Sequence, residues 1–428
     1  MRRVLALVDG EHYAPVVRDA LAGLDDEVVA AVLVGGTEKL RGGEDYGVPL
    51  RESVEGAIDE LAPDAVVDLS DEPVLGPVER FRLASRVLAH GIPYEGPDFR
   101  LEPPRFHPVD VPSLVVCGTG KRVGKTAVTG FLVRQLARRR RVVVVAMGRG
   151  GPAEPEVVTV PPTVEALVAL SRSGRHAASD HLETAALAGV ETVGCRRCGG
   201  GLAGAVATSN VLEGAAVAAG LDPELVVFDG SGAALPPIAA ERRVLVVGSL
   251  QEHHVATGYL NAYRALLADL VVVTMAEEGT PHARLANDLQ ALVRPGVPVV
   301  RTILRPRPAE AVAGERVAYF GTAPAAQHER IAVELGDVHG AHVTHVSGAL
   351  ADRAQLRAEL GSVDADTFVV ELKAAAVDVV VEEAMRRGAR VVLAANEVVP
   401  LAGEPGLAGE LQRLADEAVS ASRSGVAS

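Results

Sequence analysis

The chain has 428 residues, enough for two to four domains, and 48% of them are hydrophobic, which allows sizeable buried cores. Its formal net charge of −14 argues against a nucleic-acid-binding surface, for which a basic excess is expected. No apolar run approaches the ~20 residues of a membrane span, and three cysteines are too few for a disulfide framework. We therefore expect a cytoplasmic protein without a nucleic-acid or membrane partner.

The first 108 residues alternate strand and helix patterns. The predicted elements, in chain order, are residues 2–10, 14–24, 27–36, 64–70 and 78–91, of which the second and last are helices. This regular alternation of strands and helices indicates a small parallel, Rossmann-like α/β domain, residues 1–108. The proline-rich stretch 96–113 is predicted to link it to the rest of the chain.

Residues 109–305 contain a second series of strands, each followed by a loop. In an open parallel sheet, the loops at the carboxyl ends of the strands form the ligand crevice. Four of these loops combine glycine with Lys, Arg, Asp or Ser, and together they predict a binding site. The valine runs Val142–Val145 and Val377–Val381 are predicted to be strands that are buried on both faces.

Residues 306–428 again alternate strand and helix patterns, and the sequence leaves open whether they continue the preceding sheet. The expected fold class is α/β. It combines a parallel-sheet phosphate-loop NTPase core (109–305) with the N-terminal Rossmann-like domain (1–108) and an α/β C-terminal region (306–428).

The segment CGTGKRVGKT, residues 117–126, has the composition of a phosphate-binding loop. Its glycines allow the backbone to curl so that N–H groups point inward. Lys125 would contact the β and γ phosphates of ATP, and the Thr126 hydroxyl would bind Mg²⁺. A strand before the loop and a helix after it provide the required context. The predicted ATP-binding residues are Gly118, Thr119, Gly120, Lys121, Arg122, Val123, Gly124, Lys125 and Thr126.

The spacing of this loop narrows its class, because Gly118 lies one residue further from Gly124 than in the common G-x-x-x-x-G-K-[ST] pattern. The pattern G-T-x-x-x-V-G-K-T resembles dethiobiotin synthetase and its relatives. Partition ATPases carry a signature lysine where this chain has Gly120. The stretch FDGSG also resembles the E-G-x-G of dethiobiotin synthetase, which implies that Asp229 holds Mg²⁺ together with Thr126. The alternative is that FDGSG is simply a turn that ends the strand and does not bind a metal ion.

Longer stretches resemble the cyclic 2,3-diphosphoglycerate synthetase family of archaea and bacteria. They are ALVDGEHYAPVVRDAL, VLVGGTEKL, CGTGKRVGKTAVTGFL, VGCRRCGGGLAG, FDGSGAALPP and VVELKAAAVDVV. The resemblance implies an ATP-dependent ligase that joins the two phosphates of 2,3-diphosphoglycerate into an intramolecular pyrophosphate, releasing ADP and phosphate. ATP and Mg²⁺ are the implied cofactors, and K⁺ is a further candidate.

The chemistry of such a reaction agrees with the residues present. Transfer of a phosphoryl group to an anionic phosphate meets charge repulsion, so catalysis depends on positioning and on neutralisation by cations. Lys121, Lys125 and Asp229, which would act through Mg²⁺, are the predicted catalytic residues.

Several loops offer candidate contacts to an anionic substrate. Guanidinium groups bind phosphate oxygens in pairs, although Arg149 could also be a solvated loop charge. His12 could shuttle a proton or accept a phosphoryl group, and a structural role near a turn is its alternative. Lys373 could contact substrate or form an ion pair. The predicted substrate-binding residues are Asp9, His12, Arg18, Arg149, Arg196, Arg197, Ser231 and Lys373.

The motif Cys195-x-x-Cys198 has three interpretations: half of a zinc site, a redox pair, or part of a glycine-rich anion loop. Zinc would need two further ligands, such as a pair of histidines. The alternative functions are a kinase or ligase acting on another phosphorylated or carboxylated metabolite and, less favoured, a partition-type switch ATPase. We expect a homodimer that acts on a small anionic substrate.

Overall fold

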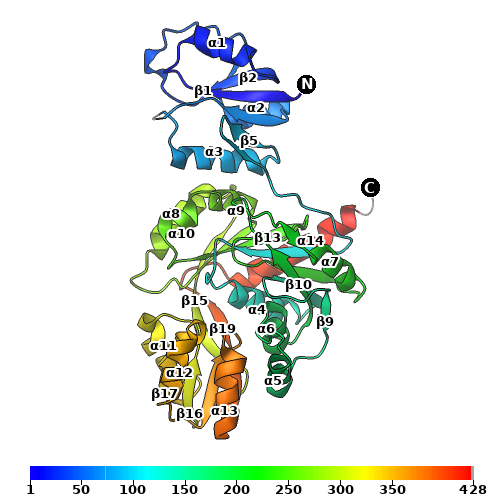
Figure 1. The fold of residues 1–428 in the computed structure, drawn as a ribbon, viewed down its shortest axis with the longest axis vertical. Coiled ribbons are helices and arrows are strands. Elements are labelled where there is room, and N and C mark those ends of the chain that lie inside the picture. The colour runs from blue at the N-terminus through cyan, green and yellow to red at the C-terminus, as the bar shows by residue number, and fades with distance from the viewer. Residues whose placement is uncertain (73, 426–428) are drawn as a thin grey trace.

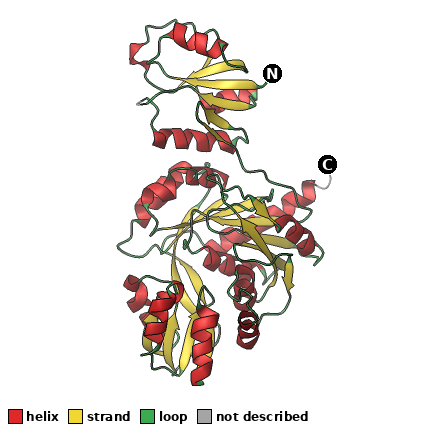
Figure 2. Cartoon of the chain, in the orientation of Figure 1, coloured by secondary structure: helices red, strands yellow, loops and turns green. Residues whose placement is uncertain are grey.

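The computed structural model describes residues 1–72 and 74–425, which form two β-sheets with helices packed around them (Figures 1 and 2). The first sheet has six strands in the order β3-β2-β1-β4-β5-β6, and only the β5–β6 pair is antiparallel. Its strands are β1 Arg3–Val8, β2 Glu27–Leu33, β3 Leu50–Arg51, β4 Ala65–Asp68, β5 Tyr94–Gly96 and β6 Phe99–Leu101. Its helices are α1 Ala14–Ala22, α2 Val54–Leu61 and α3 Pro77–Ala89, with a 3₁₀ turn at Thr37–Lys39.

This N-terminal domain contacts the rest of the molecule through α3, which packs on α9 (Asn261–Leu267) (Figure 1). The rings of Phe81 and Tyr259 meet edge to face with their centroids 5.4 Å apart, and the Ser85 hydroxyl donates to the Tyr259 carbonyl at 3.2 Å. The α3 face is therefore the surface through which the N-terminal domain contacts the helices beside the central sheet.

The second sheet has 13 strands and runs through both the core and the C-terminal region, in the order β11-β10-β8-β12-β7-β13-β14-β15-β19-β18-β16-β17, with β9 paired to β10. Its strands are β7 Ser113–Gly118, β8 Val142–Gly148, β9 Glu156–Val158, β10 Glu191–Cys198, β11 Thr208–Ser209, β12 Leu225–Asp229, β13 Arg242–Gly248, β14 Leu270–Thr274, β15 Val299–Pro308, β16 Arg316–Phe320, β17 His342–Ser347, β18 Thr367–Glu371 and β19 Arg390–Pro400. The remaining helices are α4 Lys125–Leu136, α5 Val164–Arg172, α6 Asp180–Ala188, α7 Val211–Ala219, α8 His253–Thr257, α10 His282–Leu292, α11 His328–Asp337, α12 Arg353–Leu360, α13 Glu382–Arg387 and α14 Leu407–Gly425, with 3₁₀ turns at Ala325–Gln327 and Ala349–Ala351.

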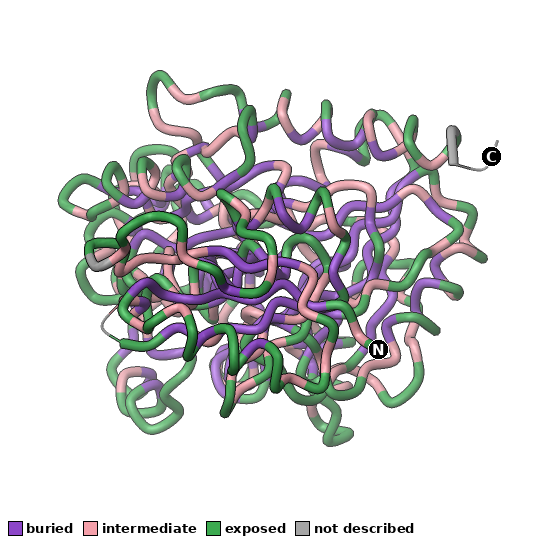
Figure 3. The backbone as a smooth tube through the Cα atoms, turned by 90° about the horizontal axis from the view of Figure 1, so that it is seen from above, coloured by how far each residue is buried: buried purple, intermediate pink, exposed green. Residues whose placement is uncertain are grey.

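Side chains of the core strands alternate between two apolar clusters, as expected for a parallel sheet covered on both sides. Figure 3 shows buried segments of the chain running through the interior of the molecule. On one face Val115 and Cys117 of β7 belong to the same apolar cluster as residues of α7, α9 and α10. On the other face Leu114 and Val116 join α4 and α14. The expected α/β phosphate-loop core is therefore present, with β7 at its centre.

Two long strands connect the core to the C-terminal region. β15 and β19 pair antiparallel from Thr302 opposite Pro400 to Pro308 opposite Ala394, so one sheet continues from one part into the other. After β19 the chain returns, and α14 packs on α4 and β7 of the core. The C-terminal strands thus carry their loops to the edge of the phosphate-loop site.

Two expectations about local structure are wrong. The valine run Val377–Val381 is not a strand, because Ala376–Val381 forms a π-helical segment that leads into α13. A short buried apolar run does not distinguish strand from helix by periodicity alone. The proline-rich stretch 96–113 is a linker only in part, since Phe99–Leu101 forms β6 and pairs with β5.

None of the helices in the described part of the chain is long and apolar enough to cross a bilayer.

Leu411 on α14 tests the contribution of this returning helix to the stability of the core. Its side chain is fully buried in the cluster that contains α4. We expect Leu411→Ala to lower the free energy of unfolding by about 2–5 kcal/mol, because a cavity replaces a packed side chain. Urea denaturation provides the measurement, and Val338→Ala, at a site 65% exposed, is the control. An equal, small change in both variants would contradict the packing role.

Candidate active site

The phosphate loop follows β7 and ends where α4 begins at Lys125. Gly124 has a φ of +78°, and a Cβ there would lie 3.1 Å from the Thr274 hydroxyl. That hydroxyl donates to the Val123 carbonyl at 2.7 Å, so β14 packs closely against the end of the loop. The loop needs glycine at this position both for its backbone conformation and for space.

Thr119 fixes the other end of the loop. Its N–H donates to the Val246 carbonyl at 3.1 Å, and its hydroxyl donates to Gln251 Oε1 at 2.6 Å. The Gln251 side chain also donates back to the Thr119 carbonyl at 3.2 Å. These contacts hold the loop against β13 and the segment that follows it.

The ion pair between Lys125 and Asp229 lies at the base of the site. The Lys125 Nζ is 2.5 Å from Asp229 Oδ1, which also accepts from the Thr129 hydroxyl at 2.9 Å. Asp229 is fully buried at the end of β12, and burial raises the pKa of its carboxyl while Lys125 opposes that shift. The second oxygen, Oδ2, is buried without a hydrogen-bond partner in the described structure.

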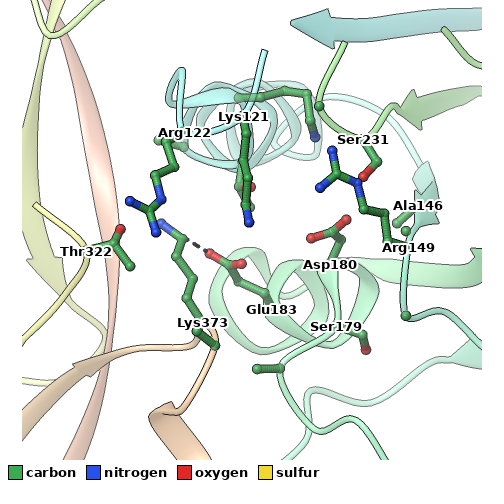
Figure 4. A pocket seen from close by; sticks show the side chains of 18 of the residues that line it. Lys121, Arg122, Ala146, Arg149, Ser179, Asp180, Glu183, Ser231, Thr322 and Lys373 are labelled. Atoms are coloured by element: carbon green, nitrogen blue, oxygen red, sulfur yellow. Dashed lines mark ion pairs between the residues drawn. The ribbon is translucent and has the colours of Figure 1, made fainter. Parts of the chain in front are cut away.

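A cavity of about 380 Å³ is lined by Lys125 and by side chains from several other elements, some of which Figure 4 shows. One wall is the phosphate loop, from Gly120 to Thr126, and another is formed by the loops after β8 and β12 together with the start of α6. The C-terminal region closes the remaining side. The charged or polar side chains that the cavity presents are Lys121, Arg122, Lys125, Thr126, Arg149, His176, Ser179, Asp180, His181, Glu183, Ser231, Thr322, Lys373 and Asn396.

Arg149, in the loop after β8, lines the cavity, and Arg197, at the end of β10, lies beside the FDGSG loop without lining either cavity. A Cβ on Gly232 would lie 2.6 Å from Arg149 Nη2, so the guanidinium end of Arg149 lies against this glycine. Arg197 donates to the Ser231 carbonyl at 2.7 Å and to the Gly199 carbonyl at 2.6 Å. Burial and the neighbouring Arg149 charge lower the pKa of Arg197. The structure thus places two guanidinium groups beside the FDGSG loop.

The sequence analysis did not identify the acidic residues of α6 as candidate site residues. Asp180 and Glu183 are three residues apart, so they share one helix face, and both line the cavity. Glu183 is 7% exposed and 4.0 Å from the Lys373 Nζ, and burial raises its pKa to about 8. Acidic residues in the first turn of a helix usually interact with the helix dipole, and for that reason the pattern carried no clear signal of a site.

Lys373 enters the cavity from the C-terminal region, just after β18. The carboxylate of Glu371 lies 3.4 Å from its Nζ and accepts hydrogen bonds from Tyr319 at 3.0 Å and Asn396 at 2.7 Å. Burial opposes ionisation of Glu371, but the Lys373 charge and these hydrogen bonds hold its pKa below the usual value. Lys373 is therefore a positioned cation between Glu371 of the C-terminal region and Glu183 of the core.

A second cavity, of about 580 Å³, adjoins the first one across the phosphate loop. The residues that line both cavities are Lys121, Arg122, Val123, Gly124, Leu304, Thr322, Lys373 and Asn396. The second cavity lies between the ends of β13, β14 and β15 and the C-terminal region. Its own lining is largely apolar or amide-bearing: Leu250, Gln251, Met275, Pro306, Tyr319, Pro324, Gln327 and Ile331, with Glu277, Arg305 and Arg330 at its charged side.

Three predicted substrate residues lie elsewhere, in the N-terminal domain. Asp9 is fully buried and accepts from the N–H groups of Asp71 at 2.8 Å and Glu11 at 3.0 Å, and from the His12 ring at 2.8 Å. Arg18 is paired with Asp45 at 3.3 Å. Neither these residues nor the exposed Arg196 line the two cavities at the phosphate loop.

The two cysteines of the C-x-x-C motif have different surroundings. Cys195 is fully buried, whereas Cys198 is exposed at the end of the same strand. Burial raises the pKa of the Cys195 thiol to about 12. No group of three or more His, Cys, Asp or Glu side chains that could hold a metal ion occurs within residues 1–72 and 74–425.

Comparison with known proteins agrees with this arrangement. Family models described as the N-terminal, P-loop and C-terminal domains of cyclic 2,3-diphosphoglycerate synthetase match residues 3–102, 113–303 and 308–397. The chain belongs to the cyclic 2,3-diphosphoglycerate synthetase family. The resemblance and the fold class predicted from the sequence are thereby confirmed.

Curated relatives match the chain over almost its whole length. The cyclic 2,3-diphosphoglycerate synthetase of Rubrobacter xylanophilus is 50% identical and covers 96% of this chain and 97% of its own. That of Pyrococcus abyssi is 42% identical and covers 96% and 98%. The structure of LpxK from Aquifex aeolicus in complex with ATP aligns with 72% of this chain and 90% of its own, at 15% identity and a TM-score of 0.43.

The raised pKa of Glu183 predicts that the difference in stability between the native protein and a Glu183→Gln variant changes with pH. The folded protein retains a proton there up to about pH 8, whereas an unfolded glutamate releases it near 4.5. The tighter binding of this proton by the folded protein stabilises the fold. This stabilisation is fully present below pH 4.5 and is lost as the pH rises through 8. We therefore expect Glu183→Gln to gain stability relative to the native protein between pH 5 and 9. Thermal melts in EDTA provide the measurement.

Glu213→Gln, the same substitution at an exposed position on α7, is the control and is measured in the same melts. A difference between Glu183→Gln and the native protein that does not change with pH would contradict the raised pKa of Glu183.

Proposed function

We propose that this protein is the ATP-dependent ligase that converts 2,3-diphosphoglycerate into its cyclic pyrophosphate. The observation that carries the proposal is the convergence of cations on one cavity. Lys125 comes from the phosphate loop, Arg149 from the loop after β8 and Lys373 from the C-terminal region. Such an arrangement can hold two polyanions side by side, which an acidic protein needs local cations to do. The curated relatives named for this product support the same reading.

The proposed reaction has two phosphoryl transfers. One substrate phosphate attacks the γ-phosphorus of ATP, its bond to the bridging oxygen breaks, and ADP leaves. The other substrate phosphate then attacks the phosphorus that carries the new anhydride, closes the ring, and expels inorganic phosphate. Both steps bring anions together, so the Lys121, Lys125 and Arg149 charges lower the barrier by neutralising charge in the transition state.

Mg²⁺ is the proposed metal cofactor, and the residues present fit it. Asp229 Oδ2 is a buried carboxylate oxygen without a partner in the described structure, next to Lys125, and Thr126 lines the cavity that Lys125 also lines. Asp180 adds a third oxygen donor on that cavity. Hard oxygen ligands of this kind suit Mg²⁺, which neutralises phosphate charge when bound. K⁺ remains a candidate additional cofactor for the assay.

The two cavities divide naturally between the two reactants. We assign the cavity that contains Arg149, Ser231 and Lys373 to the substrate, because of the two cavities only this one is lined by Lys125, Arg149 and the FDGSG loop. The neighbouring cavity, lined by groups such as Met275 and Gln327, suits a nucleoside, which is largely apolar with a few hydrogen-bonding edges. In this arrangement the γ-phosphate lies over the phosphate loop, at the junction of the cavities.

We further propose that the protein acts in the cytoplasm and as a homodimer. The free state of Cys117, Cys195 and Cys198 supports a reducing compartment. The strands β11 and β17 end the large sheet and support assembly, because open sheet edges are commonly covered.

Phosphorus NMR tests the reaction directly. With ATP, Mg²⁺, K⁺ and 2,3-diphosphoglycerate, we expect a new pair of mutually coupled pyrophosphate resonances together with ADP and phosphate. Lys125→Ala should reduce the rate at least ~100-fold, because it removes the buried cation beneath the transferred phosphoryl group. Turnover of ATP without these resonances would instead indicate a kinase or ligase that uses another metabolite.

Arg149 and Arg196 provide a matched pair for the substrate site, since both are exposed arginines but only Arg149 lines the cavity. We expect Arg149→Ala to raise the KM for 2,3-diphosphoglycerate by about 10- to 100-fold, the range for one lost charge-assisted hydrogen bond. Arg196→Ala should leave it within about two-fold of the native value. Steady-state kinetics at saturating ATP provide the measurement, and equal effects of both variants would contradict the assignment.

A further inference from the structure

Arg264 on α9 is a buried cation whose visible partners are all main-chain carbonyls. It is 3% exposed, and its guanidinium donates to Ala233 at 2.9 and 2.6 Å, to Leu202 at 3.2 Å from two nitrogens, and to Leu260 at 2.8 Å. Among the described residues no carboxylate lies within ion-pair distance of it. A buried charge costs several kcal/mol unless hydrogen bonds replace its hydration. All three guanidinium nitrogens of Arg264 therefore donate hydrogen bonds to these carbonyls.

The carbonyls of Leu202 and Ala233 belong to two separate loops, of which the one after β12 lines the cavity. Leu202 lies between β10 and β11, and Ala233 lies just after Ser231 and Gly232, which line the cavity. Within the same pair of loops, the N–H of Leu235 donates to the Gly204 carbonyl at 2.9 Å. Arg264 thus ties the loop that carries Ser231 to the loop that directly follows the predicted substrate residues of β10.

Gly204 shows how closely this guanidinium is packed. Its φ is +91°, and a Cβ there would lie 3.0 Å from Arg264 Nη2 and 2.8 Å from the Leu235 side chain. Arg197 bridges the same two loops through its bonds to the carbonyls of Gly199 and Ser231. Two arginines therefore hold this pair of loops together.

Asn261, three residues earlier on α9, reaches the other half of the site. It is 7% exposed, and its Nδ2 donates to the Thr119 carbonyl at 3.2 Å and to the Val255 carbonyl at 2.7 Å. Thr119 is the phosphate-loop residue that Gln251 also holds. One short helix thus directs one side chain to the nucleotide side of the site and one to the substrate side.

We propose that α9 positions both halves of the active site, with Asn261 setting the phosphate loop and Arg264 setting the loops that bind the diphosphate substrate. Neither side chain lines the cavities, so each acts through the backbone that it holds. Arg264 needs the planar guanidinium, because a lysine has a single nitrogen and cannot reach carbonyls in separate loops with a fixed fork. This inference rests on the proposed function for the identity of the substrate.

The two variants should therefore affect different reactants. We expect Arg264→Lys to raise the KM for 2,3-diphosphoglycerate at least about ten-fold while the KM for ATP stays within about two-fold. We expect Asn261→Ala to do the reverse. Arg284→Gln, at a largely exposed arginine on α10, is the matched control and should change neither constant. A purely structural role would lower the melting temperature without separating the two constants.

Calorimetric binding of Mg·ATP and of 2,3-diphosphoglycerate, each measured alone, makes the outcome independent of turnover. Unchanged affinities, or equal losses for both ligands in both variants, would overturn the inference. If Arg264→Lys does not fold, Asn261→Ala decides, since a selective loss of ATP affinity is required of it. If the native protein binds ATP but not 2,3-diphosphoglycerate, the proposed function fails, and the ATP measurement on Asn261→Ala still tests the positioning role.

Discussion

The buried pair of Lys125 and Asp229 is the contact on which the rest of the site depends. It joins the first residue of α4 to the end of β12, at the carboxyl edge of the central strands. Because Asp229 is fully buried and holds the Lys125 ammonium, the lysine is kept in one orientation without needing bound phosphate to order it. The second oxygen of Asp229 is buried without a hydrogen-bond partner in the described structure, which leaves it available to the Mg²⁺ that we propose.

A second requirement of the site is that cations from distant parts of an acidic chain lie together at the carboxyl edge of the central strands. Parallel strands bring the loops after β7, β8 and β12 there automatically, because their carboxyl ends align. Lys373 cannot arrive in that way, since it follows a strand of the C-terminal region. The β15–β19 pair provides the route, because it continues one sheet across the boundary and carries β18 alongside. A separate C-terminal domain on a flexible linker would hold Lys373 much less firmly.

The sequence predicted the parts of the site that depend on local chemistry. The phosphate loop was recognisable because strand, glycines, lysine and helix are adjacent in the chain, and Arg149 and Ser231 because they follow buried strands. Asp180 and Glu183 were missed, since an acidic first turn looks the same in a site and on a surface. Glu371 was missed as well, because its role depends on Asn396, a partner on another strand. The valine run at 377–381 was misassigned, since the periodicity of a short apolar run does not separate a buried strand from a buried helical segment.

Two carboxyl groups lie beside Lys373, although negative charge there would oppose the binding of the polyanions that we propose for this cavity. An isolated lysine in a buried site tends to lose its proton, and it lacks a fixed direction. Glu371 answers both needs, because its carboxylate stays ionised and its other bonds, from Tyr319 and Asn396, fix it in place. Glu183 is different, since burial raises its pKa to about 8. In its acid form it adds no negative charge to the cavity at neutral pH and presents an O–H donor. The cavity can therefore be crowded with acidic side chains and still favour phosphate.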